Sequence, residues 1–188
     1  AQTPGRWPGL GIAVFGFMRA AMMQNTLTSL GQQGALNSVH VFVDGDQGDP
    51  VKRRKIDPVA EIAASFPIAQ LHRRRGNVGF RKMMLQAMKI MSEQYRYIIF
   101  LEDDCFPTAD SVERFYQELK GIETMPDVFS VYGHPFLVPD EQEYCTRFQG
   151  WGWATPAEKL APLREDLLNC YLMPEDEYLS FTAETLTD

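Results

Sequence analysis

Residues 97–104, with the sequence YIIFLEDD, decide the fold class predicted for this chain. Five apolar residues of strand length, Tyr97–Leu101, run directly into three consecutive carboxylates, Glu102, Asp103 and Asp104. An entirely apolar strand is typical of a parallel sheet that helices cover on both faces. Ligands bind such sheets at the carboxyl ends of the strands, so the three carboxylates mark a candidate functional site.

Outward from this stretch, strand-like and helix-like segments alternate. We predict further strands at residues 11–17, 38–43, 67–71 and 128–132, and helices at residues 18–30, 57–66, 80–94 and 110–119. This alternation predicts an α/β fold with a mostly parallel sheet and helices on both faces.

The remaining segments give weaker signals. Asp110 with Glu113, and Thr155 with Glu158, have the spacing of a capping box and predict two helix starts. A second short helix is predicted from Pro174, and the Gly- and Pro-bearing, charged residues 45–57 are expected to form a mobile loop.

Length and charge limit the classes of function. The 188 residues suffice for a single domain, and the net charge of −7 argues against binding a long nucleic-acid backbone. The charge is uneven: residues 1–139 are nearly balanced, whereas residues 140–188 carry 11 acidic and 3 basic side chains, so an anionic ligand is expected on the first part. No apolar run would span a bilayer, and we expect a soluble domain, cytoplasmic if the protein is bacterial.

The carboxylates after residue 101 suit a hard divalent cation, Mn²⁺ or Mg²⁺, which would bridge to phosphate oxygens of a substrate. A solvated acidic turn is the alternative interpretation. Arg19 and Asp44 follow the first two predicted strands and are candidate nucleotide contacts or simple surface ions. Near Arg74, Asn77 and Arg81, clustered cations at a helix start would attract a diphosphate, unless this is only a solvated basic loop.

Two tryptophans stand among glycines in the segment Gly150–Trp153. Indole rings stack on sugars but are more often core residues, so we expect one of Trp151 and Trp153 in the core and one beside the site. His134 follows the last predicted strand of the first part, and a lone histidine there is more often a hydrogen-bonded structural residue.

Taken in order, these features resemble the GT-A class of nucleotide-sugar glycosyltransferases over about residues 10–182. Within that class they are most similar to the N-acetylglucosaminyltransferase I type and related bacterial family 2 enzymes. Residues 102–104 after the apolar strand are similar to the DxD-type motif of the class, and GWGWAT (150–155) is the next most specific element.

The resemblance implies a metal-dependent, inverting transfer of a sugar from a nucleotide-diphosphate donor, such as a UDP-sugar, to a hydroxyl of a glycan or small molecule. It implies that Asp104 coordinates Mn²⁺ (or Mg²⁺) and that Glu175 or Asp176 is the base. The implied donor-binding residues are Arg19, Asp44, Arg74, Asn77, Arg81, Glu102 and Asp103, and the implied acceptor-side residues are Trp151, Gly152 and Trp153.

It further implies a nucleotide-binding part at about residues 10–135 and an acceptor-side part at about residues 136–188 that is reduced relative to the class. Two alternatives stay open. A sugar nucleotidyltransferase would share the sheet and the metal, but normally has a Gly-rich basic signature that the segment Phe15–Arg19 lacks. A non-catalytic glycan-binding or assembly module would keep the tryptophans and need no divalent ion.

Overall fold

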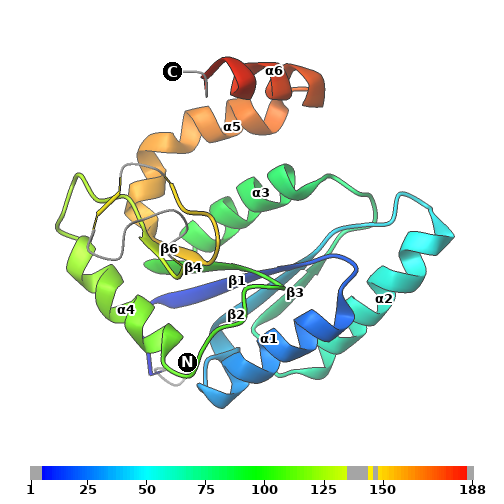
Figure 1. Ribbon diagram of the computed structural model, residues 1–188, viewed down its shortest axis with the longest axis horizontal. Helices are drawn as coiled ribbons and strands as arrows, with labels where there is room; N and C mark the ends of the chain where they lie inside the picture. The colour runs from blue at the N-terminus through cyan, green and yellow to red at the C-terminus, as the bar shows by residue number, and fades with distance from the viewer. Residues whose placement is uncertain (1–5, 135–143, 146–147, 186–188) are drawn as a thin grey trace.

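The computed structural model describes residues 6–134, 144–145 and 148–185 and places one six-stranded sheet at the centre of the molecule (Figure 1). The strand order is β3-β2-β1-β4-β6-β5. The strands are β1 (Leu10–Gly16), β2 (Val39–Val43), β3 (Gln70–Arg73), β4 (Tyr97–Glu102), β5 (Val131–Tyr132) and β6 (Trp153–Pro156). β3, β2, β1 and β4 run parallel, while β6 lies antiparallel to β4 and to β5.

Helices cover both faces of this sheet, as predicted. On one face α1 (Ala20–Gln32), α2 (Pro50–Ser65) and α4 (Ser111–Ile122) pack against alternate residues of the strands, and α3 (Phe80–Ser92) packs on the other. Short 3-10 segments, Leu36–Ser38 and Ala157–Leu163, join these elements. The predicted α/β class with a mostly parallel sheet is therefore confirmed.

β4 is the central strand that carries the carboxylates to the edge. Ile98, Ile99 and Phe100 are at most 1% exposed because β1 pairs on one side, β6 on the other, and helices cover both faces. Phe15 of β1 is in register with both Phe42 and Glu102, so three parallel strands end at the same level. Residues that follow these strands must emerge together.

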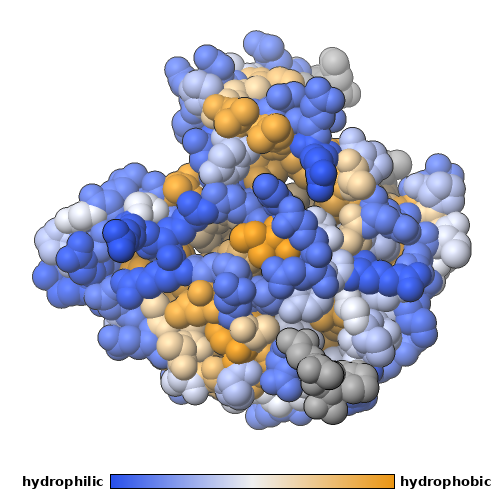
Figure 2. Space-filling model, turned by 180° about the vertical axis from the view of Figure 1, so that it is seen from behind, coloured by the Kyte–Doolittle hydropathy of each residue, from blue (hydrophilic) through white to orange (hydrophobic). Residues whose placement is uncertain are grey.

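The last two helices, α5 (Arg164–Leu172) and α6 (Glu175–Thr185), stand apart from the sheet beyond α3 (Figure 1). Neither helix has a fully buried residue among those described. Seen from behind, this projecting part carries apolar surface (Figure 2). The exposed apolar residues of these helices are Leu168, Leu172, Leu179 and Phe181.

The N-terminal half of α2 corrects the prediction of a mobile loop at residues 45–57. The helix begins at Pro50 because the Asp49 side chain accepts hydrogen bonds from the backbone N–H groups of Val51 (2.8 Å) and Lys52 (3.3 Å). Pro58, which we expected at the helix start, lies inside the helix. Proline at the first helical position loses no hydrogen bond, so the Asp49-Pro50 pair was the stronger signal.

The two predicted capping boxes are also wrong. Asp110 makes no side-chain capping bond, and Glu113 instead accepts a 2.8 Å hydrogen bond from the Trp7 indole. Thr155 lies in β6, and its hydroxyl donates to the Phe129 carbonyl. The strand β6 was not predicted, because its four residues follow glycines and lack the alternation of a longer strand.

A buried histidine pair links β2, β3 and the end of α3. His40 Nδ1 lies 3.0 Å from His72 Nε2, and His40 Nε2 lies 2.8 Å from the Tyr95 hydroxyl. Burial, together with the neighbouring His72, lowers the pKa of His40 to about 4. A neutral imidazole can donate at one nitrogen and accept at the other, so uncharged His40 can make both contacts at once.

This pair predicts a loss of stability in acid. Between pH 6.5 and pH 4 the unfolded chain takes up a proton at His40 that the folded chain does not, so the free energy of unfolding falls as the pH falls. His40→Gln should remove about 2 kcal/mol of that fall between pH 7 and pH 4, measured by urea unfolding at each pH. His134→Gln, at an exposed histidine, is the control, and parallel pH profiles for wild type and His40→Gln would contradict this assignment.

Candidate active site

One arginine paired with two aspartates occupies the edge of the sheet where β1 and β4 end. Arg19, between β1 and α1, donates from Nη1 to Asp104 Oδ2 at 2.7 Å and from Nη2 to Asp103 Oδ1. The Arg19 side chain is 51% exposed and that of Asp104 46%, whereas that of Asp103 is only 2% exposed. The structure thus brings together Arg19 and two of the three carboxylates identified in the sequence.

The buried carboxylates at this edge carry an electrostatic cost. Burial raises the pKa of Asp103, and the hydrogen bond from Arg19 opposes that shift. Burial, and secondly repulsion from Asp104, raise the pKa of Glu102. In addition, Asp103 Oδ2 is buried and has no hydrogen-bond partner among the described residues. A buried carboxylate oxygen without a hydrogen-bond partner is one observation that fits a cation-binding role for this edge.

The second and third turns of α1 fix the segment after β4. The hydroxyl of Thr26 donates to the Asp103 carbonyl at 2.9 Å, and that of Ser29 donates to the Pro107 carbonyl. Both side chains are buried. They lie three residues apart and so share one helix face, which holds Asp103 and its neighbours in a fixed position.

A cleft of about 560 Å³ opens beside these carboxylates. Glu102 and Asp104 line it from the end of β4, and His134 and Trp151 line it from the segments that flank β5 and β6. The rings of His134 and Trp151 are 6.0 Å apart. Further lining residues near its mouth are Cys105, Phe106, Pro107, Thr108, Gly133 and Gly152.

The donor set fits a divalent cation that is shared with a substrate. Among the described residues no three His, Cys, Asp or Glu side chains are grouped to hold an ion by themselves. Mg²⁺ and Mn²⁺ at phosphate sites need only one or two carboxylates, since substrate oxygens and water complete the shell. Asp104, together with the unpartnered oxygen of Asp103, meets that requirement.

Asp44, at the end of β2, is committed to the backbone of the loop before α3. Its carboxylate accepts hydrogen bonds from the N–H groups of Val78 (3.0 Å) and Gly79 (2.9 Å), and from Gly45 (2.8 Å). Asn77 supports the same loop, because its side-chain oxygen accepts from the Gly79 N–H at 3.1 Å. Both predicted nucleotide contacts therefore shape the start of α3, where Gly79 has a φ of 82°.

Asp44→Asn should destabilise the fold, because an amide offers one acceptor oxygen in place of two and leaves a backbone N–H unpaired. We expect a loss of about 1–3 kcal/mol in the free energy of unfolding, measured with urea. Asp127→Asn, at an exposed position, should change little. Equal stability of the two variants would show that the Asp44 carboxylate does not support this loop.

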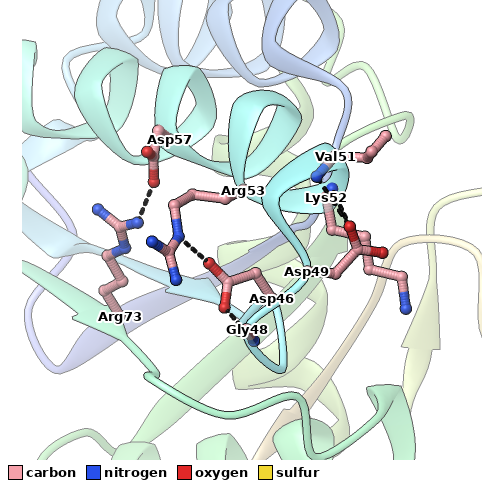
Figure 3. A network of polar contacts seen from close by, with 8 residues as sticks. All are labelled: Asp46, Gly48, Asp49, Val51, Lys52, Arg53, Asp57 and Arg73. Carbon is pink, nitrogen blue, oxygen red and sulfur yellow. Dashed lines mark hydrogen bonds and ion pairs between the residues drawn. The ribbon is translucent and has the colours of Figure 1, made fainter.

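The basic segment after β3 is partly neutralised within the chain. Figure 3 shows Arg53 paired with Asp46 at 2.5 Å and Arg73 paired with Asp57 of α2. Arg74 is half-buried, and no side-chain partner for it is found among the described residues. Arg74 and the exposed Arg75, for which the described residues likewise offer no side-chain partner, are thus the available guanidinium groups of this cluster, close to the loop that Asp44 holds.

Arg81 is occupied by the C-terminal helices. Its guanidinium donates to the carbonyls of Cys170 and Met173 (3.2 Å) and to Glu175 Oε2 at 2.8 Å, and it stacks 4.3 Å from the Tyr178 ring. Predicted as a donor contact, Arg81 instead ties the start of α6 to the start of α3. Glu175 is its ion-pair partner, and the adjacent Asp176 is exposed.

Removal of this tie should loosen the projecting helices without unfolding the sheet. In Arg81→Met, amide hydrogen exchange within α5 and α6 should accelerate at least about tenfold, while the amides of β1 and β4 keep their protection. The control is Arg114→Met, since Arg114 is exposed on α4. Unchanged exchange in α6 would mean that Arg81 is not what holds it.

The two tryptophans of GWGW lie in different surroundings. Trp153 is 2% exposed in β6, stacked on Phe100 at 4.4 Å, and is a core residue, not an acceptor contact. Trp151 is 53% exposed and lines the cleft with Gly152, whose φ of 63° favours glycine. One tryptophan in the core and one beside the site is the arrangement expected from the sequence.

Sequence reasoning missed three cleft residues. His134 was interpreted as structural, yet it is exposed and faces Trp151 across the cleft wall. Cys105 and Phe106 follow the three carboxylates directly. The signal that could have identified Cys105 and Phe106 as cleft residues is their position directly after a predicted central strand.

Comparison with known proteins identifies the class. The sequence model of the family described as Glycosyl transferase family 2 matches residues 12–170. The fold is that of the GT-A class of transferases. The chain belongs to glycosyl transferase family 2. No curated protein matches it.

Solved structures with the same fold include a mannosyltransferase from Pyrobaculum calidifontis in complex with GDP-Man and Mn²⁺, with a TM-score of 0.56 and 16% identity over 87% of this chain. This chain spans 48% of that protein. A 4-diphosphocytidyl-2C-methyl-D-erythritol synthase from Anaerococcus prevotii has a TM-score of 0.55 and 9% identity, with 93% of this chain and 82% of that one covered.

A cytidylyltransferase from Leptospira borgpetersenii serovar Hardjo-bovis has a TM-score of 0.51 and 12% identity. The alignment covers 84% of this chain and 64% of that one. Among the described residues, no helix is both long and apolar enough to cross a membrane.

Proposed function

We propose that the chain transfers a sugar from a nucleotide-diphosphate donor, such as a UDP-sugar, to a hydroxyl group of a glycan or small molecule, with a divalent cation and with inversion at the anomeric carbon. The observation that carries this proposal is the set of carboxylates at the edge of the sheet, with a buried, unpartnered oxygen on Asp103 beside an exposed Asp104. Membership of family 2 supports the transferase class.

Asp104 and the free oxygen of Asp103 would hold Mn²⁺ or Mg²⁺. When bound, the cation neutralises the negative charge that develops on the departing diphosphate. In this proposal Arg19, which pairs with Asp104, would contact the same phosphates, and Glu102, which lines the cleft, would contact donor hydroxyls. Arg74 is the second cation available to the nucleotide, while Asp44 and Asn77 position the loop on which it rests.

The acceptor would enter the cleft beside Trp151. Indole faces stack on sugar rings, and Trp151 and Gly152 lie on the same cleft as Asp104. Asp176 is the better candidate base, because Arg81 engages the carboxylate of Glu175. A base opposite the diphosphate would activate the hydroxyl for attack on the far face and so invert the anomeric centre. Residues 10–135 would then be the donor part, and residues 136–188 the acceptor side.

A sugar nucleotidyltransferase is the second candidate, because two solved structures of the same fold are nucleotidyltransferases. Such an enzyme normally has a Gly-rich, basic first loop whose backbone N–H groups and cationic side chains bind a triphosphate. In this chain that loop supplies a single cation, Arg19, which already pairs with two carboxylates. The geometry therefore favours a diphosphate donor.

Calorimetric titration of UDP with and without Mn²⁺ tests the proposal. We expect binding that requires the metal, and in Asp104→Asn a loss of at least about tenfold in affinity, because a carboxylate ligand becomes a neutral amide. Asp110→Asn, an exposed acid further along the same segment, is the control. UDP binding that is independent of Mn²⁺, or unaffected by Asp104→Asn, would contradict the metal assignment.

A further inference from the structure

The guanidinium of Arg19 occupies the carboxylates that a divalent cation would need. It is held by Asp104 at 2.7 Å and by Asp103 at the same time. Charge-assisted hydrogen bonds between a guanidinium and a carboxylate are short and stronger than neutral hydrogen bonds, and Arg19 makes one to each of the two carboxylates. A metal ion that approaches Asp104 must therefore compete with a positive charge already in place.

In the pair of Arg19 and Asp103, Arg19 is the side chain that can move. Asp103 is 2% exposed, and its backbone is anchored by the buried Thr26 hydroxyl. Arg19, in contrast, is half exposed and precedes the first turn of α1 in a non-helical conformation, with φ −114° and ψ 70°. An exposed arginine at a helix start can change rotamer at little cost, whereas a buried carboxylate cannot.

The charges decide when Arg19 would leave. The edge holds Glu102, Asp103 and Asp104 against one guanidinium. A divalent cation would neutralise the negative charge of these carboxylates in place of Arg19. Arg19 would then have no ion-pair partner and would lie beside a second positive charge. A diphosphate removes this penalty, because its oxygens bind the cation and also accept the guanidinium in bidentate geometry.

We propose that Arg19 makes metal binding conditional on the diphosphate: it holds Asp103 and Asp104 when no donor is bound and transfers to the phosphates when cation and donor bind together. Arg19 is thus a positioning residue, and the inference rests on the proposed function. Because binding couplings are reciprocal, the donor strengthens metal binding by the same factor as the metal strengthens donor binding.

The test measures Mn²⁺ binding to the purified chain from the EPR signal of free Mn²⁺, first without nucleotide and then with UDP, after correction for the Mn–UDP complex in solution. Wild type should bind Mn²⁺ alone weakly and bind it much more tightly with UDP. Arg19→Gln should bind Mn²⁺ alone at least about fivefold more tightly, and its enhancement by UDP should fall about tenfold. If Arg19 only stabilised the fold, Arg19→Gln would instead bind Mn²⁺ less tightly than wild type, both without UDP and with it.

Arg53→Gln is the matched control, since Arg53 is also a half-exposed arginine paired with a largely buried aspartate, Asp46, at a strand end (Figure 3). It should leave both quantities unchanged. Arg19→Lys, which keeps the charge without the bidentate geometry, should lie between wild type and Arg19→Gln and serves if Arg19→Gln does not fold. In Arg19→Gln combined with Asp104→Asn, the gain in binding of Mn²⁺ alone should vanish.

The outcomes separate this inference from the proposed function. If wild type binds Mn²⁺ with UDP but Arg19→Gln binds Mn²⁺ alone no better than wild type, the role of Arg19 is wrong and the metal site stands. If wild type does not bind Mn²⁺ even with UDP, both proposals fail.

Discussion

The burial of β4 is the constraint on which the rest of the molecule depends. This strand is paired on both sides and covered on both faces, so its place at the centre of the sheet is fixed. The next three residues are carboxylates, which must therefore emerge at the edge of the sheet, beside the ends of β1 and β2. One of them, Asp103, remains almost fully buried. Burial disfavours the charged form of Asp103, and the hydrogen bond from Arg19 offsets part of that cost.

Much of the polar network in this chain gathers near the same edge. α1 holds the segment after β4 through Thr26 and Ser29, and the Asp44 carboxylate holds the loop before α3. On the other side Arg81 ties the C-terminal helices to that same helix start. The contacts of α1 and of Asp44 each fix a loop that follows the carboxyl end of a strand, which is where a preorganised transferase site needs rigidity.

How much could be predicted from the sequence depended on the length of the pattern. The apolar run at 97–101 and the alternation around it gave the parallel sheet, because a buried strand constrains every residue in it. The antiparallel β6 was missed, since four residues carry no periodicity, and the start of α2 was misplaced because Pro58 also resembles a helix start. Residue type identified Arg19 and the three carboxylates as one site. It could not show that Asp44 binds backbone N–H groups, that Arg81 binds helix carbonyls, or that Trp153 lies in the core, because those facts depend on which partners the fold brings near.

The central claim is that the edge of the sheet serves a glycosyl transfer, and product analysis tests it most directly. Phosphorus NMR of the chain with Mn²⁺, a panel of nucleotide sugars and hydroxyl acceptors should show release of a nucleoside diphosphate together with a new glycoside, and chelation of the metal should stop it. Release of pyrophosphate from a nucleoside triphosphate and a sugar phosphate, with nucleotide sugars left intact, would contradict the account and assign the fold to nucleotidyl transfer.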